Sequence, residues 1–243
     1  MRTIAVLGGA LAIYVAVTLL VAALTGDALT GAAAANITAF VLFLVYRQWS
    51  TGTPQAAAAH PIAKTSRFWG YALSTLVVCW LAGQSAGMSL YLAWGSDGFD
   101  AVAGTQANAP LGLLLVSTVV FAPIGEESLL RGIAYPALRT HWSPLVAAVI
   151  TALGFAVLHG NIVQIALTVP LGILLAFVYE SSQRLWPLVL MHAGFNAIAF
   201  AMPVPIILVL ANPFVATALV AAAGLSLYLF RQWSKGGALA DSR

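Results

Sequence analysis

Six ionisable or strongly polar side chains interrupt long apolar stretches of this sequence. They are Glu126, Glu127, Arg131, His159, His192 and Asn196. A charged group inside a membrane is costly, and an unpaired polar group in hydrocarbon also loses its hydrogen bonds. We therefore expect these side chains to face one another. Such a set could catalyse hydrolysis by general acid–base chemistry, hold a metal ion or relay protons.

The spacing of these residues predicts how they pair. Glu127 and Arg131 are separated by four positions, so a helix places them on one face as an ion pair. Glu126 points about 100° away from Glu127 on a helix of 3.6 residues per turn. His192 and Asn196 are also four positions apart and should project toward one neighbour. One carboxylate is thus neutralised while the other stays available.

The apolar segments 110–138 and 144–159 should form a hairpin that brings two of these groups together. A rise of 1.5 Å per residue places Glu126 and His159 at similar depth, about 20 to 25 Å from the connection. Phe155, one turn before His159, could wall the site. His192 should lie only about 8 Å from the start of its own segment. We therefore expect the hairpin to project into the cytoplasm and the site to occupy the cytoplasmic half of the membrane.

The composition indicates the environment of these segments. The chain has 243 residues, of which 61% are hydrophobic and 7% are charged. Soluble domains carry about 25% charged residues, so a water-facing globule is excluded. The single Cys79 rules out a disulfide framework or a thiolate metal cluster. No basic run is long enough to bind nucleic acid, and the lipid bilayer is the expected partner.

An all-α, polytopic membrane protein with about eight transmembrane helices is the predicted fold class. The expected spans are 4–24, 28–46, 68–94, 110–138, 144–159, 162–179, 187–201 and 204–230. We divide the chain into an N-terminal region 1–109 with a cytoplasmic linker at 47–67, a catalytic core at 110–201, and a last helix with a tail at 202–243. The segments 95–109 and 202–203 are expected to be loops.

The basic residues predict the orientation of the chain, because Lys and Arg near span ends remain in the cytoplasm. They fall on alternate connections: Arg2, Arg47, Lys64, Arg67, Arg139, Arg184, Arg231, Lys235 and Arg243. The intervening connections contain no Lys or Arg, whereas Asp27, Asp97 and Asp100 lie there. Both termini should therefore be cytoplasmic.

Three motifs in order give the chain a resemblance to a known family. They are Glu-Glu-x-x-x-Arg at 126–131, Phe-x-x-x-His at 155–159 and His-x-x-x-Asn at 192–196. In this respect the segment 110–201 resembles the CPBP family of intramembrane proteases, also called ABI, which includes the CAAX prenyl endopeptidases. The resemblance implies a core of eight transmembrane helices, a water-filled cavity and peptide hydrolysis near the membrane interface.

On this basis we expect an intramembrane endopeptidase that acts without a cofactor. Glu126 would be the general base and His159 would orient the attacking water. His192 and Asn196 would stabilise the oxyanion, while Glu127 would hold Arg131 and shape the site. The substrate is expected to be a membrane-anchored or transmembrane protein or peptide. The short loops and Ala-rich composition favour a bacterial plasma membrane.

Three alternatives remain open. A zinc-dependent form of the same protease would use Glu126, His159 and His192 as ligands. A proton-coupled transporter would use the buried Glu, Arg and His groups as a relay. An inactive family member could act as a scaffold or immunity factor.

Overall fold

We analysed a computed structural model of the chain, which describes all residues except 1, 50–62, 64, 203 and 241–243. The described residues are almost entirely helical and contain no strand. They form two compact units that alternate along the chain: residues 1–56, 101–143 and 185–197 make unit 1, and residues 57–100, 144–184 and 198–243 make unit 2. The predicted linker at 47–67 falls largely outside the described residues.

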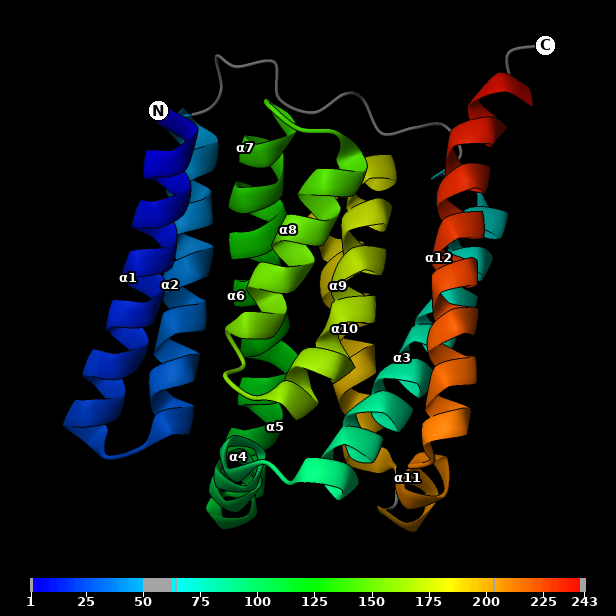
Figure 1. Cartoon of the computed structure of the whole chain (residues 1–243). Helices are drawn as coiled ribbons and strands as arrows, with labels where there is room; N and C mark the ends of the chain where they lie inside the picture. The colour runs from blue at the N-terminus through cyan, green and yellow to red at the C-terminus, as the bar shows by residue number, and fades with distance from the viewer. Residues whose placement is uncertain (1, 50–62, 64, 203, 241–243) are drawn as a thin grey trace. The chain divides into compact units, whose positions relative to one another are not determined.

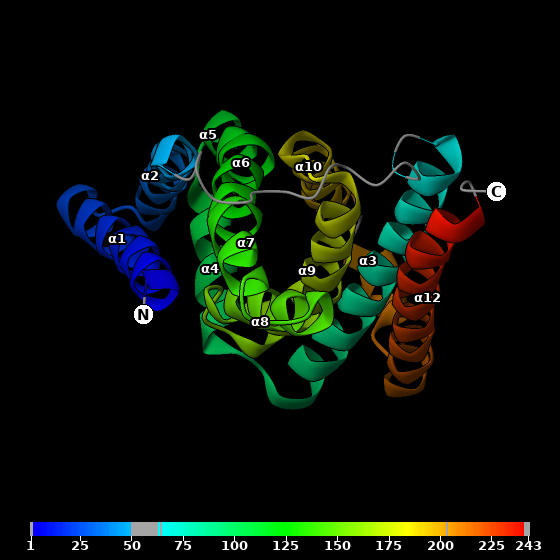
Figure 2. The same ribbon diagram turned by 90° about the horizontal axis from the view of Figure 1, so that it is seen from above.

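Unit 1 contains the N-terminal hairpin and the helix that carries both adjacent glutamates. The hairpin consists of α1 (Arg2–Thr25) and α2 (Ala28–Trp49), which run side by side (Figures 1 and 2). The glutamate helix is continuous through α5 (Leu111–Leu115), η2 (Val116–Phe121), α6 (Ala122–Glu127), η3 (Ser128–Ala134) and α7 (Tyr135–Arg139). Most of α4 (Asp97–Asn108) and of α10 (Leu185–Ala201) completes the unit.

Unit 2 is built on two long helices, α3 (Ser66–Trp94) and α9 (Ile162–Ser182), which pack against each other. The helix α12 (Pro213–Ala240) lies beside α3, and α8 (Pro144–Val157) packs on α9 (Figure 1). A short helix, α11 (Val204–Leu210), also contacts α3. Gly83 allows close approach, because a Cβ there would lie 2.7 Å from the Leu167 carbonyl oxygen.

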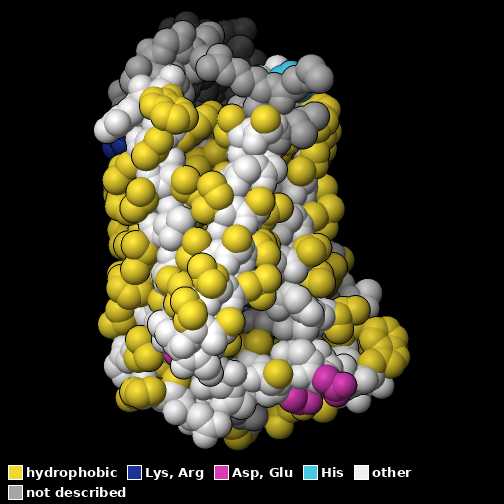
Figure 3. All heavy atoms as spheres, turned by 90° about the vertical axis from the view of Figure 1, so that its left-hand side faces the viewer, with side chains coloured by type: hydrophobic (Ala, Val, Ile, Leu, Met, Phe, Trp, Pro, Cys, Tyr) yellow, Lys and Arg dark blue, Asp and Glu magenta, His cyan; other side chains and the backbone are white. Residues whose placement is uncertain are grey.

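The helices confirm the predicted fold class of an all-α, polytopic membrane protein. Among the described residues, six helices are long and apolar enough to cross a membrane, and two shorter apolar helices, α8 and α10, accompany them. Large hydrophobic side chains of α1 are exposed, including Leu19 and Leu24. Hydrophobic side chains cover this face of the hairpin (Figure 3). An apolar exterior of this kind requires lipid as its solvent, so the protein is integral to the membrane.

Two prolines explain the unusual form of the glutamate helix. Pro123 and Pro136 each follow a π-helical turn, and the amides of Ala122 and Tyr135 bond to carbonyls five residues back, at Ser117 and Leu130. A proline ring inside a regular α-helix clashes with the carbonyl four residues earlier. A π turn inserts an additional residue into the helical turn before the ring, and such turns are frequent at functional sites.

Two expectations about connections were wrong. The predicted loop 95–109 contains α4, whose first turn carries Asp97 and Asp100, and acidic groups stabilise the N-terminus of a helix. The predicted span 204–230 is interrupted before Pro213. Asn212 accepts hydrogen bonds from the amides of Phe214 and Val215 and thereby begins a new helix.

Asp27 joins α1 to α2 and begins the second helix. Its carboxylate accepts hydrogen bonds from the amides of Leu29 and Thr30 at 3.2 and 2.9 Å. The Thr30 hydroxyl also bonds to it. These side-chain and backbone hydrogen bonds from Thr30 hold the pKa of Asp27 below its usual range. The negative charge of Asp27 is thereby kept at the positive end of α2.

Candidate functional site

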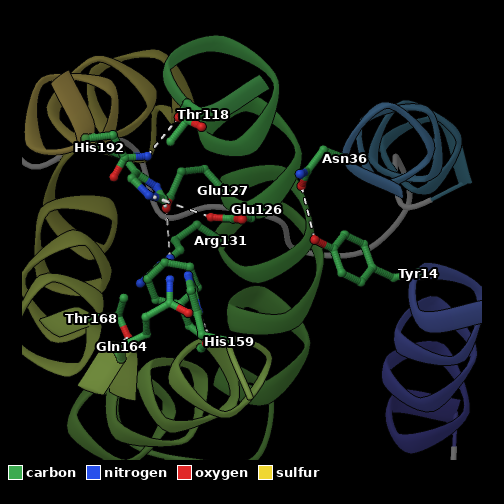
Figure 4. Close-up of polar contacts among 12 residues, drawn as sticks. Tyr14, Asn36, Thr118, Glu126, Glu127, Arg131, His159, Gln164, Thr168 and His192 are labelled. Atoms are coloured by element: carbon green, nitrogen blue, oxygen red, sulfur yellow. Dashed lines mark hydrogen bonds and ion pairs between the residues drawn. The ribbon is translucent and has the colours of Figure 1, made fainter. Parts of the chain in front are cut away.

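Glu127 is the centre of a buried charge network in unit 1. Its Oε1 accepts a hydrogen bond from Arg131 Nη1 at 3.0 Å, and both side chains are fully buried. His192 Nδ1 lies 2.9 Å from the same oxygen. The ion pair follows the spacing predicted from the sequence, and α10 adds the histidine as a third member (Figure 4).

Glu126 has a different environment from its neighbour. Its side chain is 15% exposed, and its Oε2 lies 3.6 Å from His192 Nε2. The imidazole of His192 therefore lies between two carboxylates, with one ring nitrogen toward each (Figure 4). Arg131 and Glu127 form a fully buried ion pair, whereas Glu126 lies beside His192 and remains partly exposed.

The two ring nitrogens of His192 restrict where protons can reside. A carboxylate only accepts hydrogen bonds, so Nδ1 carries the hydrogen that is donated to Glu127. Nε2 lies 3.6 Å from Glu126 Oε2, which is too long for a hydrogen bond but within the range of an ion pair.

Asn196 connects α10 to the π-helical part of the glutamate helix. Its Nδ2 donates to the backbone carbonyl of Thr118 at 2.9 Å. Thr118 lies within η2, where the wider hydrogen-bonding register changes the partners of the backbone carbonyls. Together with the His192–Glu127 bond, this contact holds α10 against the glutamate helix at two points one turn apart on α10.

An apolar groove of about 550 Å³ runs along the glutamate helix within unit 1. Its walls come from three helices: Ile37, Phe40 and Phe43 of α2, Phe121 and Ile124 of the glutamate helix, and Trp186, Val189 and Leu190 of α10. Asn36 and Ser128 also line it, but neither glutamate does. One side of the glutamate helix therefore lines an apolar groove, and another side carries the polar network of Glu126 and Glu127.

His159 belongs to unit 2 and is oriented by its own backbone surroundings. It follows the end of α8, and its Nδ1 lies 2.9 Å from the Phe155 carbonyl oxygen. Because a carbonyl only accepts, Nδ1 carries the hydrogen, and a neutral His159 has its lone pair on Nε2. The Phe155 ring packs edge-on against the imidazole at a centroid distance of 4.9 Å.

The loop after His159 is held as well. Asn161 donates to the His159 carbonyl at 3.1 Å and accepts from the Gln164 amide as the cap of α9. These bonds fix the backbone on both sides of the imidazole. The expected place of His159 and Phe155 beside Glu126 stays a prediction, because the two residues lie in the other unit.

The donor set of unit 1 matches a catalytic zinc site only in part. Such a site has three protein ligands, and a ligand histidine donates its second N–H to a carboxylate. Glu126 and His192 could be two ligands, with Glu127 as the carboxylate that holds Nδ1. Among the described residues of this unit, no group of three His, Cys, Asp or Glu side chains is arranged to hold a metal ion. Unit 1 alone thus lacks the third ligand.

Two residues near Glu126 were missed as site residues. The Tyr14 hydroxyl donates to Asn36 Oδ1 at 3.3 Å, and Asn36 is buried against Gly125 (Figure 4). Asn36 was not among the residues predicted for the site. A polar side chain in an apolar span was its only signal, and Tyr14 had none.

Comparisons with known proteins agree with this description. Residues 108–198 match the family model described as type II CAAX prenyl endopeptidase Rce1-like. The Bacillus subtilis (strain 168) protein named "Putative membrane peptidase YdiL" is 27% identical over 107 residues. That match covers 44% of this chain and 43% of the relative. No solved structure matches the chain.

The fold and the site define a polytopic helical membrane protein with a carboxylate–histidine network inside its helices. Residues 108–198 are thus similar to a family of membrane peptidases, in agreement with the resemblance that the three motifs predicted, and the chain spans less than half the length of the relative that it matches. The matched region includes every predicted site residue and excludes the α1–α2 hairpin.

Proposed function

We propose that the protein is an intramembrane endopeptidase that hydrolyses a peptide bond in a membrane-anchored or transmembrane protein or peptide. The observation that carries this proposal is the contrast between the two adjacent carboxylates. Arg131 and His192 both contact Glu127, so this carboxylate is not available to act as a base. Glu126 is partly exposed and contacts a histidine that can exchange a proton with it. A general base needs this combination of access and proton exchange.

In the proposed reaction, the Glu126 carboxylate takes a proton from a water molecule that His159 Nε2 helps to orient. The water oxygen bonds to the carbonyl carbon, and the carbonyl oxygen becomes an oxyanion. His192 and the second N–H of the Asn196 amide stabilise this charge. The tetrahedral intermediate then collapses, the C–N bond breaks, and the proton held by Glu126 passes to the leaving amine. The products are a carboxylic acid and an amine, and the proton that the acid releases is taken up by the amine, which gives a carboxylate and an ammonium group.

The apolar groove supports a substrate that comes from the membrane. Its rim residues Trp186 and Leu190 are 59% and 62% exposed, so the groove opens toward lipid. An apolar peptide segment could lie there beside the glutamate helix. We place the protein in a bacterial plasma membrane with both termini in the cytoplasm.

The test compares new protein termini in membranes from cells with the wild-type protein and with the Glu126→Gln variant. We expect termini that depend on the wild-type protein to disappear with Glu126→Gln, while the variant remains folded because Glu126 is half-buried. Glu180→Gln is a matched control, because this residue lies in α9 of the other unit. Identical termini in all three samples would refute the protease assignment.

A chelator arm of the same experiment separates the alternatives. The metal-free mechanism predicts that phenanthroline changes cleavage by less than about twofold. Strong inhibition that zinc reverses would instead establish the zinc-dependent form. Proton-coupled flux in vesicles that Glu126→Gln abolishes, without any change in termini, would support the transporter.

A further inference from the structure

The α1–α2 hairpin contacts the glutamate helix directly beside Glu126, although it lies outside the family match at 108–198. Asn36 of α2 is buried and packs on Gly125. A Cβ at Gly125 would lie 2.4 Å from the Asn36 Cα and 2.5 Å from its backbone oxygen. The backbone of α2 therefore sets the position of the residue that precedes Glu126.

Tyr14 of α1 completes this contact. Its hydroxyl donates to Asn36 Oδ1 at 3.3 Å, and the bond connects the two helices of the hairpin (Figure 4). A buried amide without a hydrogen bond is costly in an apolar interior. The bond from Tyr14 thus orients the Asn36 side chain where α2 meets the glutamate helix.

Two other elements of unit 1 carry titratable or charged groups near Glu126. His192 of α10 contacts it directly at 3.6 Å, and Arg131 of η3 acts through Glu127. Among the described residues, the buried face of α2 carries no charged side chain, and its polar residue Asn36 is bonded to Tyr14 of α1.

We propose that Tyr14 and Asn36 are positioning residues for Glu126. Through them the α1–α2 hairpin helps to arrange the catalytic site. The backbone of Asn36 packs on Gly125, and the Tyr14 hydroxyl orients the Asn36 side chain at this contact, one residue before Glu126. The assignment of a catalytic consequence rests on the proposed function, whereas the positioning itself does not.

The test uses Tyr14→Phe, which removes one hydroxyl and keeps the ring. Tyr46→Phe is the matched control, because Tyr46 is also half-buried and lies ten positions after Asn36 on α2. The full-length variants are treated with dicyclohexylcarbodiimide, an apolar reagent that attaches to protonated carboxyl groups. Mass spectrometry then measures the adduct at Glu126 as a function of pH, and Glu126→Gln verifies the site of attachment. No substrate is needed.

We expect Tyr14→Phe to move the pH of half-maximal labelling by about half a pH unit or more, a shift that corresponds to the loss of one hydrogen-bond-sized interaction. Tyr46→Phe should follow the wild-type profile. Asn36→Ala should change the profile in the same way, and adding Tyr14→Phe to it should have little further effect because the pair acts as one unit. Thermal unfolding in detergent identifies any variant that fails to fold.

The kinetic readout shows whether the positioning serves proteolysis. With a substrate identified from the comparison of termini, Tyr14→Phe should lower kcat about threefold to tenfold and leave KM within about twofold. A Tyr14→Phe labelling profile that coincides with the wild-type profile overturns the positioning proposal, whatever the cleavage assay gives. A shifted profile in a protein that cleaves nothing keeps the positioning and refutes the proposed function instead.

Discussion

Glu126 and Glu127 are adjacent in sequence, yet burial and partners give them different properties. Glu127 is fully buried and accepts from two side chains, so its charge is neutralised in place. Glu126 is partly exposed and shares His192. A buried ion pair adds little net stability compared with apolar residues, but removal of one partner leaves a charge in a medium that cannot solvate it. Glu127 and Arg131 should therefore act on folding more than on chemistry.

Removal of the buried cation should therefore destabilise the protein. Arg131→Met should lower the free energy of unfolding by about 3 to 5 kcal/mol, because it leaves Glu127 buried without its counter-charge. The double variant Glu127→Gln/Arg131→Met should recover part of this loss. Arg184→Met, at an exposed cation, should stay within about 0.5 kcal/mol of the wild type. Denaturant titration of the purified proteins in detergent measures all three, and a wild-type-like Arg131→Met protein would contradict the role of the pair.

The sequence predicted the residues of this network better than it predicted their contacts. The Glu127–Arg131 pair followed from a spacing of four positions, because local helical geometry determines it. The contacts of His192 join residues 65 positions apart and depend on the rotation of α10 about its axis. Tyr14 and Asn36 could not be identified because a single polar residue in an apolar helix has the same pattern whether it packs or positions.

At the scale of the elements, glycines allow α2 to approach the glutamate helix. A Cβ at Gly132 would lie 2.5 Å from Cδ2 of Phe43, and one at Gly125 would meet the Asn36 backbone. Small residues at helix contacts permit close packing in membranes, where apolar burial gives little driving force. The sequence predicted a loosened helix at Pro123 but not the π form, since that depends on how the neighbouring helices accommodate the wider turn.

A smaller side chain on α2 should relieve an added methyl group at Gly132 but not one at Gly125. Gly132→Ala should destabilise the protein by about 1 to 3 kcal/mol, because the new methyl group overlaps the Phe43 ring. Phe43→Leu should relieve this loss in the double variant, since the obstacle is a side chain. Gly125→Ala meets backbone atoms of Asn36 and should not be relieved in the same way.

Gly112→Ala, where a Cβ meets nothing within 4 Å, is the control and should be neutral or stabilising. Thermal unfolding in detergent gives the ranking of the variants. If Gly132→Ala behaved like Gly112→Ala, the close approach of α2 to the glutamate helix would be wrong.

At the scale of the whole molecule, composition alone predicted a helical membrane protein, because 7% charged residues cannot cover a soluble surface. In the part of the chain that the structure describes, the eight predicted apolar segments correspond to six long helices and two shorter ones, and the last segment also contains the short helix α11. The break that the hydropathy pattern did not predict lies where a capping side chain begins a helix, as Asn212 does before α12. A hydropathy pattern averages over such single residues. The orientation of the chain in the membrane is predicted from the distribution of Lys and Arg and not from hydropathy.

That distribution predicts which side of the membrane each connection faces. Arg47, Lys64 and Arg67 flank the connection between α2 and α3, so its residues should be cytoplasmic. The segment 95–109 has no Lys or Arg and should lie on the opposite side. Two variants are made in a Cys79→Ala background, which removes the single cysteine, and each carries one reporter cysteine at an exposed position. Ser66→Cys reports on the expected cytoplasmic side, and Ala107→Cys reports on the opposite side.

A membrane-impermeant maleimide applied to intact bacterial cells should label Ala107→Cys and leave Ser66→Cys unlabelled until the cells are broken. The unmodified Cys79 protein should remain unlabelled in both conditions, because that thiol is buried in α3. The reverse pattern would place α4 in the cytoplasm and invert the chain. Since the glutamate helix begins directly after α4 and ends at Arg139, inversion would also reverse the direction in which that helix crosses the membrane.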